Sequence, residues 1–183
     1  LEKEGFEVTY IPVDENGIID LEELKKAIKP TTILISVMFA NNEIGTIEPI
    51  KEIGKIAKKN KIYFHTDAVQ AVGSIKIDVQ DLNIDSLSLS GHKFYGPKGI
   101  GALYVKTGIN FKKFIDGGHQ ERNKRAGTEN VAAIVGMGKA LEMAYENMDE
   151  HNEKIRALRD YYESQVLEKI PYVKVNGNRE NRL

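Results

Sequence analysis

The run 32–39 most constrains the fold, because it is almost continuously apolar and β-branched. Such a run is typical of a strand covered on both faces, as in a parallel sheet. Further strands are predicted over 62–66, 86–90 and 101–105. A helix is predicted over 50–59, where the apolar residues recur on one helical face. Strands that alternate with helices predict an α/β fold with a mostly parallel sheet and helices on both faces.

Elements are also expected nearer the two ends of the chain. Alternating apolar residues predict a strand over 6–11, and a helix is expected after Asp20, a residue type favoured as an N-cap. The pattern then becomes helical over 131–147 and about 150–168, and a last strand is predicted over 172–175. The change near residue 150 indicates a boundary between one α/β domain and the start of a second domain.

The composition excludes several classes of function. The net charge is −1 at pH 7, so no nucleic-acid or anionic-membrane partner is expected from bulk electrostatics. No apolar run approaches the roughly 18–20 residues of a membrane span, so a cytoplasmic location is the default expectation. The chain has no cysteine, which excludes a disulfide, a thiolate zinc site or a cysteine nucleophile within it. Its start at Leu1 predicts a piece of a longer protein.

Polar side chains follow three of the predicted strands. They are Asn42 after the first, Asp67 and Gln70 after the second, and the segment 90–93 after the third. In open α/β sheets, ligands bind beyond the carboxyl ends of the parallel strands. An amide, a carboxylate, a hydroxyl, an imidazole and a lysine therefore converge there, a collection that suits an aromatic, anionic aldehyde cofactor.

Each of these residues also has a simpler interpretation. Asp67 could cap a helix or a turn, Lys93 could be a solvated surface charge, His92 a hydrogen-bonded loop residue and Asn42 a turn former. Only their joint placement favours an active site. The glycine-rich segment 91–101 is not a phosphate loop, because a strand follows it where a helix should begin.

Five segments resemble the NifS/IscS-type cysteine desulfurases, pyridoxal-phosphate (PLP) enzymes of the class V aminotransferase group. In the order of that family, the segments are 41–45, 65–70, 90–101, 117–121 and 125–130. The one departure is His119, where the family commonly has a third glycine. The resemblance implies a partial PLP-binding large domain over 1–148 and the start of a small C-terminal domain over 149–183.

The resemblance also implies a role for each residue beyond the strands. Lys93 would bind the cofactor aldehyde covalently and later accept the substrate α-proton. Asp67 would keep the cofactor ring nitrogen protonated, which makes the ring a better electron sink. Gln70 and Asn42 would lie near the phenolic oxygen of the cofactor, and Asn42 also near the substrate carboxylate.

The remaining roles concern the phosphate and the dimer. Ser90 and His92 would bind the cofactor phosphate, and Thr128 would reach the phosphate of a neighbouring subunit, which implies a homodimer. His65 lies two residues before Asp67 and is expected to be a hydrogen-bonded structural residue. The basic run 122–125 is interpreted as a solvated or interface surface.

The implied parent enzyme converts L-cysteine to L-alanine and passes the sulfur, as an enzyme persulfide, to an iron–sulfur scaffold or another acceptor protein. The family's sulfur-accepting cysteine and substrate-carboxylate arginine would lie outside these residues, so the chain alone is expected to be inactive. Two alternatives remain, namely another class V PLP enzyme such as a selenocysteine lyase or an aminotransferase, and a cofactor-free scaffold. The joint presence of Lys93, Asp67, Gln70 and His92 opposes the scaffold.

Overall fold

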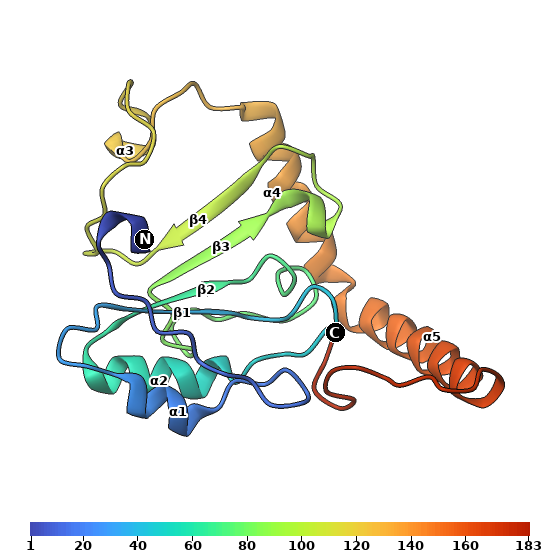
Figure 1. The fold of residues 1–183 in the computed structure, drawn as a ribbon. Helices are drawn as coiled ribbons and strands as arrows, with labels where there is room; N and C mark the ends of the chain where they lie inside the picture. Colours follow the sequence, from blue (N-terminus) through green and yellow to red (C-terminus); the bar gives the residue numbers. More distant parts are fainter.

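A computed structural model describes residues 1–183 and contains one four-stranded sheet (Figure 1). Its strands, in spatial as well as chain order, are β1 (Leu34–Met38), β2 (Tyr63–Asp67), β3 (Ser86–Ser90) and β4 (Gly101–Val105). The pairs β1–β2 and β2–β3 are parallel, whereas β4 returns antiparallel to β3. The predicted mostly parallel α/β sheet flanked by helices is confirmed.

Four of the five helices were predicted, and the short α3 (Gln120–Asn123) was not. The four are α1 (Leu21–Ala27), α2 (Ile50–Asn60), α4 (Val131–Glu146) and α5 (Met148–Lys169), with 3-10 turns η1 (Glu2–Glu4) and η2 (Gly91–Phe94). Asp20 caps α1 as expected, because its side chain accepts the backbone N–H groups of Glu22 and Glu23 at 2.8 and 3.1 Å. None of the helices combines the length and apolarity of a bilayer span.

The core lies between the sheet and the helices α1 and α2. Ile53 on α2 and Phe64 on β2 are fully buried there and belong to one apolar cluster. Gly54 brings α2 against the connection before β3, since a Cβ at this position would lie 2.0 Å from the Leu82 carbonyl oxygen. On the opposite face of the sheet, Tyr63 remains half exposed. Burial on one face therefore fixes the sheet whose strand ends carry the candidate site.

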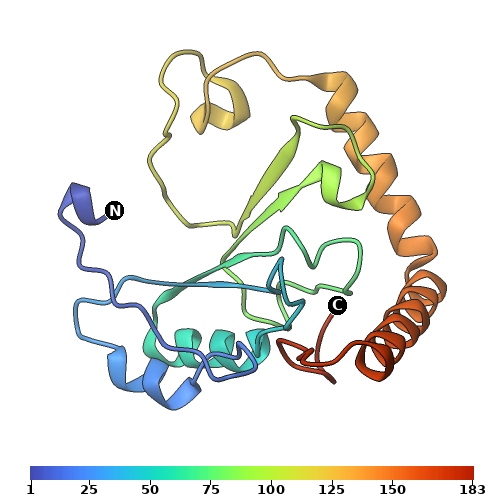
Figure 2. The ribbon, with the colours of Figure 1, turned by 45° about the vertical axis from the view of Figure 1, so that its right-hand side comes forward.

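The two C-terminal helices run along one side of the sheet. Figure 2 shows α4 and α5 as a long arm, after which the last residues turn back toward the ends of the strands. The returning C-terminal residues form an antiparallel β-bridge between Arg182 and Thr46. The last residues of the chain therefore meet the loop that follows β1, beside the strand ends.

Two predicted strands are wrong. Residues 6–11 and 172–175 are irregular, and neither segment pairs with a strand of the sheet. Alternating apolar residues favour an extended chain, but a strand also needs a neighbour whose backbone groups it can pair with. Phe6 and Tyr10 are at least half exposed, so the alternation buries no apolar face here.

Candidate active site

A small cavity of about 190 Å³ lies at the carboxyl ends of β1 and β2. It is lined by Met38, Ala40, Asn42, Asp67, Val69 and Gln70. Three residues that the sequence singled out, Asn42, Asp67 and Gln70, therefore share one cavity. The cause is topological, because parallel strands end at the same edge of a sheet.

Within the chain, only one of the two carboxylate oxygens of Asp67 accepts a hydrogen bond. Oδ1 accepts the backbone N–H of Val69 at 2.9 Å, so Asp67 does form the turn that the simpler interpretation proposed. Oδ2 has no hydrogen-bond partner, and the side chain faces solvent beside the cavity. The same residue can thus shape the turn and accept a proton donor from a ligand.

Asn42 stands on a loop whose shape comes from its neighbours. We call residues 41–47 the rim loop. The side chain of Asn41 accepts the backbone N–H groups of Glu43 and Ile44 at 2.9 and 3.1 Å. Thr46, fully buried, donates to the Asn16 carbonyl at 2.7 Å. These bonds leave the side chain of Asn42 exposed at the cavity.

The lysine segment follows β3, the neighbouring strand. Ser90 ends this strand, and its Oγ lies 2.8 Å from Nδ1 of His92. In η2 the side chain of Phe94 is buried, whereas His92 and Lys93 are exposed. Lys93 makes no ion pair, so no carboxylate of the chain holds its amine. Ser88, two residues before Ser90 on β3, pairs in register with Asp67 on β2. The turn η2 therefore lies beyond the same edge of the sheet as the cavity.

His65 lies on the same face of β2 as Asp67 and bridges two hydroxyls. Its Nδ1 is 2.8 Å from Oγ of Ser36 on β1, and its Nε2 is 2.9 Å from Oγ of Ser88 on β3. Burial lowers the pKa of His65, and the charge of Asp67 opposes that shift only in part. The expected hydrogen-bonded structural role is confirmed. The two serine partners were missed, although Ser36 is a lone hydroxyl within the apolar run of β1.

Thr128 lies apart from the cavity, in an exposed loop before α4. The basic run 122–125 is also largely exposed. Glu121, Arg122 and Asn123 all have left-handed backbone angles, with φ between 48° and 64°. His119 contacts this turn, because its Nδ1 is 3.0 Å from Oδ1 of Asn123. The loop therefore has a defined shape without contributing to the cavity within one chain.

The sequence did not predict the contact made by the last residues of the chain. We call residues 176–183 the C-terminal strap. It pairs with the rim loop through the Thr46–Arg182 bridge, and the Ile47 N–H donates to the Asn181 carbonyl at 3.1 Å. A second cavity of about 590 Å³ lies between the rim loop, α5 and the strap, and it shares Asn42 and Gln70 with the first.

The donor set at the strand ends fits PLP. The free oxygen of Asp67 matches a protonated ring nitrogen, and the amides of Asn42 and Gln70 beside it match the ring oxygen. Ser90 supplies a hydroxyl for a phosphate at the neighbouring strand end, and the unpaired Lys93 supplies an amine for an aldehyde.

A family model for aminotransferase class V matches residues 1–183. The chain belongs to the class V aminotransferase family. It is 62% identical over 180 residues to cysteine desulfurase IscS of Clostridium botulinum, covering 98% of this chain and 45% of that protein. Enzymes of this family and cysteine desulfurases depend on PLP.

Solved structures agree with this assignment. A NifS-like protein superposes with a TM-score of 0.88 at 43% identity, over 91% of this chain and 46% of that one. SspA in complex with cysteine superposes with a TM-score of 0.75 at 49% identity, over 77% of this chain and 41% of that one. The chain thus spans about half the length of the class V relatives it matches.

Proposed function

We propose that this chain is part of a PLP-dependent cysteine desulfurase, which converts L-cysteine to L-alanine and retains the sulfur as an enzyme persulfide. One observation carries the proposal, namely that Asn42, Asp67 and Gln70 line one cavity at the strand ends, with Lys93 following the next strand. The relative from Clostridium botulinum, named a cysteine desulfurase, and the cysteine bound to SspA support the substrate.

Asp67 and Lys93 would carry the chemistry. PLP, when bound, supplies an aromatic ring that withdraws electrons from the substrate α-carbon. Asp67 would hold the ring nitrogen protonated through its free Oδ2, since an opposing carboxylate favours the charged form. Lys93 would anchor the aldehyde and, once released, take the α-proton with its amine. The lack of an ion pair at Lys93 supports this role.

The other residues would bind and orient. Gln70 and Asn42 would donate amide hydrogens to the ring oxygen, and Asn42 would also contact the substrate carboxylate. Ser90 and His92, already 2.8 Å apart, would donate to the phosphate from the turn that carries Lys93. A phosphate held by fixed donors would keep the reactive aldehyde near the lysine.

The assembly that we propose is a cytoplasmic homodimer that delivers sulfur to an iron–sulfur scaffold or another acceptor protein. Thr128, exposed and outside the cavity of its own chain, would contact the phosphate in the partner subunit. We further propose that residues 1–148 belong to the cofactor-binding domain and 149–183 to the start of a smaller one. Helix α2 of the first part buries five residues, whereas α5 at the start of the second buries only Met148, which supports that division.

Borohydride labelling tests the central assignment. The full-length protein is mixed with PLP, reduced with borohydride, digested and mapped by mass spectrometry. We expect one dominant cofactor adduct on Lys93 and its loss in Lys93→Ala. Lys98, an exposed lysine of the same segment, offers the matched control, and Lys98→Ala should leave the adduct in place. A dominant adduct elsewhere, or an unaltered yield in Lys93→Ala, would overturn the assignment.

A further inference from the structure

The C-terminal strap and the rim loop are in backbone contact. The strap residue Gly177 has φ of 86°, and a Cβ there would lie 2.9 Å from Cβ of Ile44 and 3.0 Å from its carbonyl oxygen. No side chain fits between the two segments without moving one of them. The Asn178 N–H also donates to the buried Oγ1 of Thr46 at 3.0 Å. A displacement of the strap must therefore disturb the loop.

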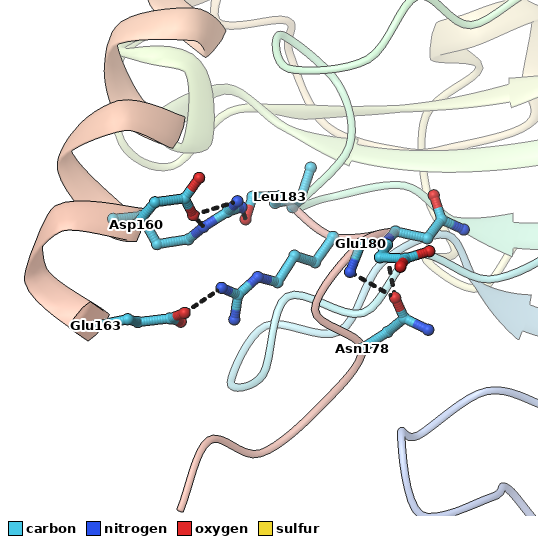
Figure 3. Close-up of polar contacts among 8 residues, drawn as sticks. Asp160, Glu163, Asn178, Glu180 and Leu183 are labelled. Atoms are coloured by element: carbon cyan, nitrogen blue, oxygen red, sulfur yellow. Dashed lines mark hydrogen bonds and ion pairs between the residues drawn. The ribbon is translucent and has the colours of Figure 1, made fainter. Parts of the chain in front are cut away.

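An ion pair holds the strap against α5. Nη2 of Arg182 lies 2.6 Å from Oε2 of Glu163, and the two side chains are only 6% and 17% exposed (Figure 3). Nε of Arg182 is buried and has no partner. The burial of this guanidinium thus relies on Glu163, because a buried charge must be paired to be tolerated.

The pair acts on the loop that carries Asn42. Arg182 itself forms the bridge with Thr46, so its backbone touches the rim loop while its side chain is held by the helix. Arg182 does not line the 190 Å³ cavity that contains Asp67. It lines the adjoining 590 Å³ cavity, which shares Asn42 and Gln70 with the first, and its backbone bridge to Thr46 reaches the site through the rim loop.

We infer that Arg182 is a positioning residue for Asn42. Its ion pair with Glu163 fixes the strap, the strap fixes the rim loop, and the rim loop presents Asn42 to the cofactor. The inference rests on the proposed function for the role of Asn42. It adds that contacts between α5 and the strap couple this helix to the strand ends, namely the Arg182–Glu163 pair and the bond from Arg159 to the Leu183 carbonyl at 2.8 Å.

A double-mutant cycle in the full-length protein tests this coupling. PLP affinity is measured by equilibrium dialysis, and the visible absorption of the bound cofactor is recorded, for the wild type, Arg182→Met, Asn42→Ala and the combined variant. We expect Arg182→Met to weaken PLP binding by about fivefold or more in the wild type and by less than about twofold in Asn42→Ala, because coupled residues are not additive. Amide exchange at Ile47, bonded to Asn181 in the strap, should accelerate in Arg182→Met.

Two further variants separate positioning from folding. In Arg182→Met with Glu163→Met, an apolar pair replaces the ion pair and should restore both exchange protection and PLP affinity. Lys139→Met removes a partner of the exposed Lys139–Glu142 pair and should change neither.

Each outcome has a separate meaning. If Ile47 exchange is unchanged in Arg182→Met, or if it accelerates while PLP affinity and absorption stay the same, the inference is wrong and the proposed function stands. Equal losses in the wild type and in Asn42→Ala would also overturn it, because Arg182 would then act by another route. If the wild type binds no PLP, the proposed function fails, and the positioning role falls with it.

Discussion

Helices α2 and α5 are held in place by different kinds of contact. In α2, with 11 residues, five residues are buried: Ile50, Ile53, Gly54, Ile56 and Ala57. In α5, with 22 residues, only Met148 is buried. What holds α5 is largely polar, including the Arg182–Glu163 pair and the bond from Asn152 to the Ser74 carbonyl at 2.8 Å. Burial fixes α2 whatever the pH, whereas the ion pair that α5 makes with the strap depends on charge.

The largest expected effect is the loss of an α2 core side chain. Ile53→Ala removes a fully buried isoleucine and should lower the free energy of unfolding by about 2–5 kcal/mol. Leu158→Ala on α5, where the side chain is 57% exposed, should change it by no more than about 0.5 kcal/mol. Urea denaturation of the full-length protein measures both. Similar losses would show that α5 is also held by burial.

The next effect concerns the charge pair of α5. Glu163→Gln leaves the guanidinium of Arg182 with no counter-charge and weakens a charged hydrogen bond, which should cost about 1.5–3 kcal/mol in the opening of the strap. Amide exchange at Ile47 reports that opening. Glu142→Gln, which breaks an exposed pair, should cost less than about 0.5 kcal/mol. If Glu163→Gln exchanges no faster than Glu142→Gln, charge does not hold the strap.

Acid should release the strap before it affects α2. The hydrogen bond from Arg182 lowers the pKa of Glu163 below its ordinary value of 4.5. When the folded-state pKa of a carboxyl lies below its unfolded pKa, the ionised carboxyl stabilises the fold fully at pH values above the unfolded pKa. This stabilisation is lost as the pH falls through the folded-state pKa. Below about pH 4.5, strap protection should fall in the wild type and stay flat in Glu163→Gln. A parallel fall in both would assign the transition to other groups.

The smallest expected effect lies inside the sheet. Burial lowers the pKa of His65 from its ordinary value of 6.5, so the unfolded chain binds this proton more readily. Stability should therefore decrease as the pH falls below about 6.5. His65→Gln can still hydrogen-bond to Ser36 and Ser88. Its free energy of unfolding should not show the decrease below about pH 6.5 that the titration of His65 causes. Identical pH profiles of unfolding for the two proteins would show that His65 does not titrate in this way.

Sequence reasoning succeeded where a local pattern was enough. Apolar runs, and alternating apolar residues in the case of β3, located the four strands. The rule for strand ends brought Asn42, Asp67 and Gln70 to one cavity. Sequence reasoning failed at 6–11 and 172–175, because strand pairing depends on a neighbour that the local pattern does not specify.

Polar contacts between residues far apart in the sequence could not be predicted for a related reason. Ser36 and His65 are 29 positions apart, and Arg182 meets Thr46 across most of the chain. Their residue types are ordinary surface polar types, and only the folded backbone shows which of them face each other. The roles of individual site residues remain predictions that the labelling and affinity experiments test.

The meeting of strap and rim loop has a consequence for the order of folding. The Asn178 N–H bonds to a threonine 132 positions earlier, so this contact closes one of the longest loops that the chain can form. During synthesis, N-terminal segments emerge first, and the sheet can assemble while the strap is still inside the ribosome. The rim loop therefore reaches its final shape only after the strap has emerged and docked, so the cavity that contains Asn42 is completed later than the sheet.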